Sequence, residues 1–178
     1  MRRQELRPGE VSAEFGALVG YSGIRFARCM TKHAGPLLVG VSFEVDPVHA
    51  AVARHFIDVA GLAAAAEVWI GLLQDTVPIL VERTGERSME FSFMDQRGTT
   101  FHEDLEQLEA LQLPGADGAL VADNVNKPGA PVFLWHVTRT AMLSTEVWSM
   151  GEFASSAVED WQSVSLRQPR QRRSETSV

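Results

Sequence analysis

The chain has 178 residues, and its content of 45% hydrophobic and 22% charged residues is typical of a globular domain with a buried core. The net charge of −7 argues against nucleic acid as a partner. No apolar run reaches the length of a membrane span, because Glu67 interrupts the longest candidate. The single cysteine, Cys29, cannot form an internal disulfide, which favours a reducing compartment. We therefore expect a cytoplasmic protein without a membrane span, and we expect a monomer.

Strand-like and helix-like segments alternate along the chain. The predicted strands cover residues 11–15, 37–45, 67–73, 88–95, 119–122, 142–150 and 161–166. The predicted helices cover residues 23–33, 47–60, 75–81, 101–113 and 131–139, and residues 114–118 are expected to form a tight loop. This alternation indicates a parallel sheet with helices on both faces. No long helix separates the last two strands, so they can be antiparallel. We expect one domain over residues 1–166 and a basic, disordered tail over residues 167–178.

Local patterns also predict how two helices are oriented. Asp46 precedes Pro47 and is expected to cap the amino end of the second helix. The apolar face of that helix is predicted from residues at helical spacing, which are Val48, Val52, Phe56 and Val59. Cys29, in the first helix, is expected to face the core as a small hydrophobic residue.

Two of the predicted strands end in acidic residues. Residues 119–122 run into Asp123 and Asn124, and residues 88–95 end at Asp95. The carboxyl edge of a parallel sheet is where ligands bind, and oxygen donors gathered there suit a hard cation such as Mg²⁺. The alternative is that these acids only cap loops.

A glycine-containing turn follows the first strand, within residues 14–20, and Glu44 ends the second strand. Such a turn lets a ligand approach the backbone, and an acid at the second position commonly binds ribose hydroxyls. The alternative for Glu44 is a solvated strand end. The glycine spacing does not match the G-x-G-x-x-G pattern of nicotinamide-dependent enzymes, and such an enzyme would leave Asp123 and Asn124 without a role.

These segments together resemble the catechol O-methyltransferase family. Residues 14–28 resemble its first motif, residues 43–47 its second, and residues 93–95 and 122–131 its metal-binding region. The separation of 28 positions between Asp95 and Asp123 also agrees with the family. The resemblance covers residues 14–166, which is nearly the whole chain.

The resemblance implies a Rossmann-like methyltransferase sandwich, with a mostly parallel seven-stranded sheet, helices on both faces and an antiparallel last strand. It also implies Mg²⁺ and S-adenosylmethionine as cofactors. The metal ligands carried over from the family are Asp95, Asp123 and Asn124. The residues carried over to the S-adenosylmethionine site are Glu14, Gly16, Tyr21, Ser22, Glu44, Gln74 and Asp95. The residues carried over to the catechol site are Asn124, Pro128 and Glu152.

The activity implied by the resemblance is transfer of a methyl group to one hydroxyl of a Mg²⁺-chelated catechol, as in catecholamine metabolism. The chain departs from the family at Gly98, where the family has a lysine that acts as general base. Gln96 and Arg97 likewise replace a histidine and an aromatic residue that lie against the cofactor adenine in the family. The chain also has few residues before its first strand. An alternative interpretation is therefore a degenerate homologue that binds cofactor or metal with little or no catalysis.

Overall fold

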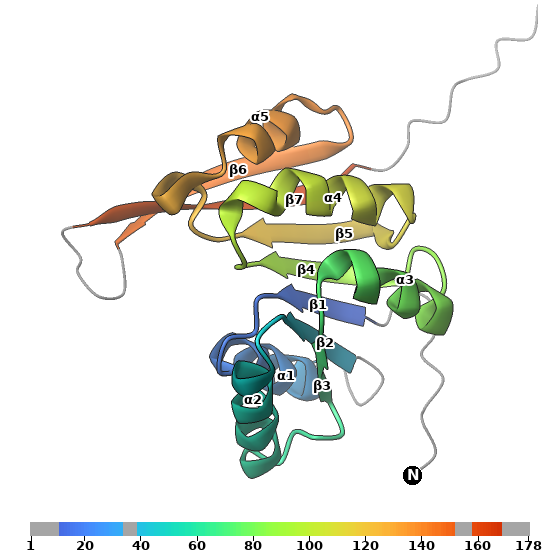
Figure 1. Ribbon diagram of the computed structural model, residues 1–178. Coiled ribbons are helices and arrows are strands. Elements are labelled where there is room, and N and C mark those ends of the chain that lie inside the picture. The colour runs from blue at the N-terminus through green and yellow to red at the C-terminus, as the bar shows by residue number, and fades with distance from the viewer. Residues whose placement is uncertain (1–10, 34–38, 152–157, 169–178) are drawn as a thin grey trace, which may run out of the picture.

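The structure of the chain is a computed structural model that describes residues 11–33, 39–151 and 158–168. Within these residues, the strands form a seven-stranded sheet in the order β3-β2-β1-β4-β5-β7-β6 (Figure 1). In chain order the strands are β1 Val11–Phe15, β2 Val39–Glu44, β3 Ala66–Ile70, β4 Met89–Met94, β5 Pro114–Ala122, β6 Leu143–Gly151 and β7 Glu159–Arg167. The first five strands pair in parallel, whereas β7 is antiparallel to both β5 and β6. The predicted fold class is confirmed, including the antiparallel last strand.

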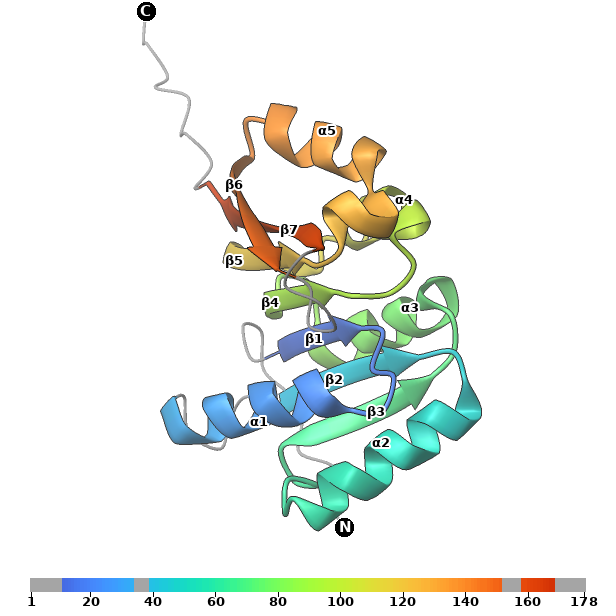
Figure 2. The same cartoon turned by 90° about the vertical axis from the view of Figure 1, so that its left-hand side faces the viewer.

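Five α-helices lie between these strands in the part of the chain that the structure describes. They are α1 Tyr21–His33, α2 Pro47–Val59, α3 Leu73–Thr84, α4 Phe101–Ala110 and α5 Pro131–Arg139. Two short helical turns, η1 Gly98–Thr100 and η2 Val125–Gly129, follow β4 and β5. Figure 2 shows α1 on one side of the sheet and α3 and α4 on the other. No described helix is long and apolar enough to cross a bilayer.

The buried side chains divide into two clusters, as expected for a sheet with helices on both faces. The larger cluster joins the central strands to α3, α4 and α5, and the aromatic rings of Phe15 and Phe43 stack in it with centroids 5.3 Å apart. The smaller cluster joins α1 and α2 to β3. Because both faces of β1 and β2 are covered, as in central parallel strands, even their polar residues are buried, namely Ser12, Glu14, Ser42 and Glu44.

The second helix confirms one prediction and contradicts another. Asp46 caps α2 as predicted, because its Oδ1 accepts hydrogen bonds from the backbone N–H groups of Val48 and His49 at 2.7 and 3.2 Å. The predicted apolar face is wrong, since the exposed fractions of Val48, Phe56 and Val59 are 67%, 46% and 72%. The residues of α2 that are buried against the sheet are Ala50, Ala53 and Ile57.

Close packing explains which face of α2 is buried. A β-carbon added to Gly20 would lie only 3.0 Å from the β-carbon of Ala53, so the turn after β1 and the helix are nearly in backbone contact. Small side chains permit this approach, and a valine or phenylalanine at that position would prevent it. Periodicity alone cannot distinguish two apolar faces of one helix, because both repeat at the same spacing.

Two further predictions are wrong. Cys29 is exposed on α1 and does not face the core. Residues 114–118 do not form a separate loop, because they are the irregular first part of β5. Met89 pairs with Pro114 and Phe91 with Ala119, so the additional residues of β5 bulge from the sheet. The third helix is also longer than predicted and contains Pro78 in its interior.

Candidate functional site

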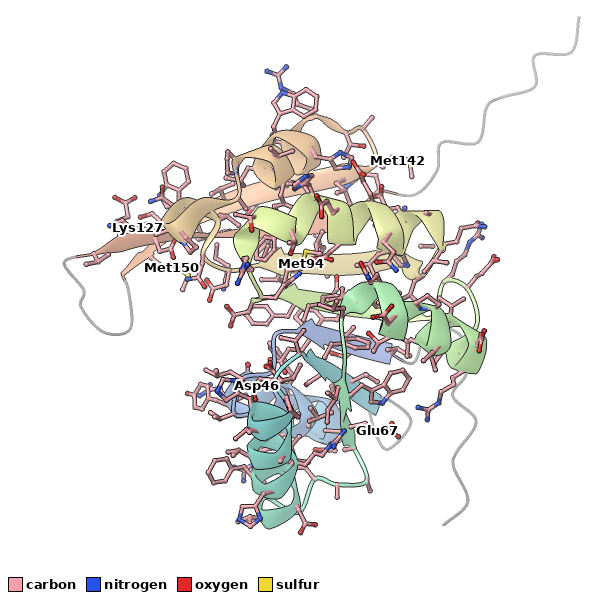
Figure 3. All side chains as sticks on the ribbon, in the orientation of Figure 1. Asp46, Glu67, Met94, Lys127, Met142 and Met150 are labelled. Carbon is pink, nitrogen blue, oxygen red and sulfur yellow. The ribbon has the colours of Figure 1, made fainter. Side chains whose placement is uncertain are left out.

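The ends of β1, β4 and β5 meet at one edge of the sheet, toward which their arrowheads point in Figure 1. The backbone N–H of Asp95 donates to the carbonyl of Phe15 at 2.9 Å, and that of Asp123 donates to the carbonyl of Met94 at 2.9 Å. These bonds place the residues after three neighbouring strands side by side. In Figure 3, Lys127 lies at this same edge, whereas Met142 lies toward the opposite end of the sheet.

The turn after β1 packs directly on the chain at Asp95. Gly16 has φ of +95°, and a β-carbon added to it would lie 2.7 Å from the backbone oxygen of Asp95. No L-residue with a side chain is compatible with both conditions without a backbone shift. Gly16 therefore keeps the first turn and the end of β4 in contact, with backbone exposed at the edge of the sheet.

Two acids lie next to this turn in the chain or in the sheet, Glu14 in β1 and Glu44 at the end of β2. Both carboxylates are buried, and Oε2 of Glu14 accepts a hydrogen bond from the hydroxyl of Ser42 at 2.6 Å. Burial raises the pKa of Glu14, against the effect of hydrogen bonds from Ser22 and Ser42 and with a further contribution from Glu44. The two oxygens of Glu44 accept from the backbone N–H groups of Leu18 and Asp46 at 2.7 and 2.9 Å. Glu44 thus holds together the segments that follow β1 and β2.

A cavity of about 670 Å³ opens between these segments and the start of α4. Four of the predicted cofactor residues line it, namely Gly16, Glu44, Gln74 and Asp95. Glu14, Ser22 and Tyr21 are not among its lining residues. The side chain of Tyr21 is 69% exposed, and its hydroxyl accepts a hydrogen bond from Arg25 at 3.1 Å.

Several residues that were not predicted to bind a ligand also line the cavity. They include Leu18, Gln96, Arg97, Thr100 and Asp104. Oδ2 of Asp104 accepts hydrogen bonds from Nε2 of Gln96 and from the hydroxyl of Thr100, both at 2.8 Å. This link joins the loop after β4 to α4 and fixes one wall of the cavity. The resemblance to the family had indicated the positions of Gln96 and Arg97, whereas Thr100 and Asp104 reach the cavity through the placement of a separate element and carry no local signal.

The two predicted metal carboxylates are electrostatically coupled. Burial, the charge of Asp123 and the charge of Glu14, in that order, raise the pKa of Asp95 to about 7. Across the described part of the chain, no group of three or more His, Cys, Asp or Glu residues is gathered as a metal cluster. The predicted donor set is two carboxylates, Asp95 and Asp123, and the amide of Asn124. That set suits Mg²⁺, which commonly binds through one or two carboxylates and leaves positions for water and substrate.

An acid that the sequence did not reveal lies beside this set. Asp160, near the start of β7, is buried and accepts from Nδ2 of Asn124 at 2.8 Å. It also accepts from the backbone N–H groups of Asn126, Lys127 and Trp161 at 3.2, 2.9 and 2.6 Å. Burial alone would raise the pKa of Asp160, but the hydrogen bonds outweigh it and lower the pKa. The antiparallel direction of β7 brings its first residues to the edge where β5 ends.

Of the predicted catechol-site residues, Asn124 and Pro128 lie within the described part of the chain. Pro128 is exposed in η2, where it follows a cis peptide bond with Lys127. Glu152 lies outside the described residues. Gly98, at the family's lysine position, is buried beneath η2, and a β-carbon added to it would lie 3.1 Å from the carbonyl oxygen of Gly129. Asp95 and Asp123 therefore lie close enough to interact electrostatically, Asn124 follows Asp123, and position 98 has no basic side chain.

The chain was compared with known proteins at three levels. No family model matches it. It is 37% identical over 134 residues to the catechol O-methyltransferase of Sus scrofa, and the aligned region covers 75% of this chain and 69% of the relative. It is 34% identical over 134 residues to the catechol O-methyltransferase of Mus musculus, and the aligned region covers 75% of this chain and 49% of the mouse protein. It is 38% identical over 116 residues to the catechol O-methyltransferase of Niastella koreensis, and the aligned region covers 65% of this chain and 49% of the Niastella protein. The chain thus matches about half the length of the mouse and Niastella proteins.

Solved structures of methyltransferases share the fold. The O-methyltransferase from Bacillus cereus in complex with SAH superposes with a TM-score of 0.75 at 23% identity, over 89% of this chain and 74% of that one. The O-methyltransferase TomG from Streptomyces achromogenes in complex with SAM superposes with a TM-score of 0.76 at 21% identity, over 89% and 73%. Identity to the pig protein above 30%, over more than two thirds of its length, together with this fold, shows that the chain belongs to the catechol O-methyltransferase family.

Proposed function

We propose that this protein transfers the methyl group of S-adenosylmethionine to one hydroxyl of a catechol-like diol, such as a catecholamine, in a Mg²⁺-dependent reaction. The observation that carries the proposal is the electrostatic interaction of Asp123 with Asp95, which lines the cavity together with Glu44. A carboxylate pair that holds a proton near neutral pH is a site that a divalent cation would occupy favourably.

The cavity is assigned to S-adenosylmethionine. Its volume of about 670 Å³ is within the usual range for a small-molecule site. Glu44 would accept hydrogen bonds from the ribose hydroxyls, because each of its oxygens has a second lone pair beyond the one used by Leu18 or Asp46. Gln74 would contact the adenine at the far wall, and Gly16 would let the sulfonium end approach the backbone. The carboxylates that line the cavity favour a cationic sulfonium.

Asp95, Asp123 and Asn124 would hold Mg²⁺ at the end of this cavity. When bound, Mg²⁺ lowers the pKa of a coordinated hydroxyl and orients its oxygen. The chain contributes the geometry, because Gly16 fixes the cofactor turn against Asp95 and the backbone of β4 fixes Asp123. In the transfer, the sulfur–methyl bond breaks, the oxygen–methyl bond forms, and the phenol proton leaves to solvent. Positioning of the two reactants supplies much of the acceleration.

Gly98 limits the expected rate. Loss of a general base typically reduces turnover by ~10²–10⁴. Since glycine cannot accept a proton, deprotonation would depend on the metal and on hydroxide. We therefore infer a slow enzyme whose rate rises with pH until the substrate hydroxyl is ionised.

The proposal is tested by measuring methyl transfer from S-adenosylmethionine to a panel of catechols in MgCl₂ and in EDTA. We expect turnover that requires Mg²⁺ and that is lost in Asp123→Ala. Asp117→Asn is the matched control, because Asp117 lies exposed near the other end of the same strand. Turnover that is unchanged by EDTA would eliminate the metal role.

A second candidate function is a homologue that binds cofactor or metal with little or no catalysis. It is favoured by the packing at Gly98, where a β-carbon would lie in tight contact, 3.1 Å from the carbonyl oxygen of Gly129. Titration calorimetry with S-adenosylhomocysteine and with Mg²⁺ separates the two. Binding of both ligands, without methyl transfer to any catechol up to about pH 9, would favour this second function, because solvent base should by then support the metal-activated reaction.

A further inference from the structure

Asp160 makes contacts that divide between its two oxygens. Oδ1 accepts from three backbone N–H groups, those of Asn126, Lys127 and Trp161. Oδ2 accepts from one side chain, through Nδ2 of Asn124 at 2.8 Å. One oxygen therefore anchors the turn η2 to β7, and the other contacts the amide that belongs to the proposed metal site.

An ionised carboxylate can only accept hydrogen bonds, whereas an amide group has one donor end and one acceptor end. Asp160 therefore excludes the orientation in which Oδ1 of Asn124 faces it, because two acceptors would then meet in a buried site. With Nδ2 held by Asp160, the amide oxygen of Asn124 must point away from β7. Metal ions bind amide groups through oxygen and not through the NH₂ group.

The backbone conformation at Asn124 explains why its side-chain amide needs a partner that fixes its orientation. Asn124 has φ of +56° and ψ of +30°, a left-handed conformation at the sharp turn between β5 and η2. Its N–H donates to Oδ1 of Asp123 at 3.0 Å, so this bond with the neighbouring carboxylate constrains the backbone and not the side-chain amide. Asp160 supplies the contact that selects one of its two orientations.

We propose that Asp160 is a positioning residue that orients the Asn124 amide with its oxygen toward the Mg²⁺ site. The inference rests on the proposed metal site, and it adds a residue from β7 that does not itself bind the metal. The same carboxylate holds the backbone of η2, so it also ties the metal ligand to the turn that carries Pro128.

Asp160→Asn separates these two contacts. The introduced amide oxygen can still accept from the three backbone N–H groups, while its NH₂ group meets Nδ2 of Asn124. Asn124 should then turn its amide and present NH₂ to the metal. The expected result is a loss of Mn²⁺ affinity of ~10–100-fold, the usual effect of removing an outer partner of a metal ligand, with a small change in Tm. Mn²⁺ binding is measured directly by electron paramagnetic resonance, without turnover.

The double variant Asn124→Asp/Asp160→Asn exchanges the two groups and restores a donor facing an acceptor. We expect its Mn²⁺ affinity to return to within about threefold of the unsubstituted protein, which a merely structural role of Asp160 would not predict. Glu159→Gln is the matched control, because Glu159 precedes Asp160, is exposed, and contacts Ser149 and Trp161 instead of η2. Its Mn²⁺ affinity should not change.

The outcomes distinguish this inference from the proposed function. If the unsubstituted protein binds no Mn²⁺, both are overturned. If it binds Mn²⁺, and Asp160→Asn binds Mn²⁺ equally well, only the role of Asp160 is overturned. Should Asp160→Asn fail to fold, the double variant decides: binding within about threefold of the unsubstituted protein supports the role, and loss of binding contradicts it.

Discussion

Gly98 packs against Gly129 so closely that a β-carbon on Gly98 would lie 3.1 Å from the Gly129 carbonyl oxygen. The position at which the family has its general base is therefore pressed against the turn that carries Pro128. A side chain here must move that turn, and the turn is held to β7 by Asp160. Glycine at position 98 thus has two effects: it removes the general base, and it permits the tight packing of η2 on η1.

Introducing lysine at Gly98 should change activity and stability in opposite directions. We expect Gly98→Lys to lower stability by about 1–3 kcal/mol, because the added side chain overpacks a close contact. We expect it to raise catechol methylation by at least ~10-fold, because an amine becomes available to accept the phenol proton. Gly98→Gln, of similar length without a base, is the control for the steric effect. Equal turnover in the two variants, measured beside thermal unfolding, would contradict a base function at this position.

Binding of Mg²⁺ should be strongly pH-dependent near neutrality. The pKa of Asp95 is about 7 in the metal-free protein, so a proton competes with the cation below that pH. Apparent affinity should rise roughly tenfold per pH unit up to about pH 7 and level off above it. Calorimetry in buffers of different ionisation enthalpy would detect the released proton. A flat affinity across this range would mean that Asp95 is not a ligand.

Asp95 should destabilise the metal-free protein at high pH. Its folded-state pKa of about 7 lies above the ordinary value of 3.8, so the native state binds more protons than the unfolded state between these limits. The unfavourable contribution is absent below the lower value and complete above about pH 7. In EDTA, Asp95→Asn should therefore have a higher Tm than the unsubstituted protein at about pH 8 and a similar Tm at about pH 4. Addition of Mg²⁺ should raise the Tm of the unsubstituted protein alone.

Glu44 should determine cofactor affinity. Glu44→Gln replaces one acceptor oxygen with a donor, which opposes either the N–H of Leu18 or that of Asp46. We expect S-adenosylhomocysteine binding to weaken by about 1.5–3 kcal/mol, the range for hydrogen bonds to a charged group. Glu82→Gln, at an exposed position of α3, serves as the control. Unchanged affinity in Glu44→Gln, by titration calorimetry, would remove Glu44 from the ribose site.

The sequence by itself determined the features that depend on neighbouring residues or on the direction of the strands. The alternation of strands and helices predicts a mostly parallel sheet, and in such a sheet the carboxyl ends lie at one edge. For this reason the sequence alone predicts that Asp95 and Asp123 lie at the same edge, although they are 28 positions apart. The Asp46 cap was equally predictable, because it involves only the N–H groups of Val48 and His49, two and three residues further along the chain.

Tertiary structure alone decided the features that depend on contacts between distant elements. Asp160 reaches Asn124 only because β7 is antiparallel to β5, with Ala122 beside Ser163. The buried face of α2 was decided by the close approach of Gly20 to Ala53, and the bulge of β5 by its pairing with β4. Each depends on the distance between two backbones, which residue periodicity does not encode. For that reason the sequence located the proposed metal ligands, and the fold identified the carboxylate that contacts one of them.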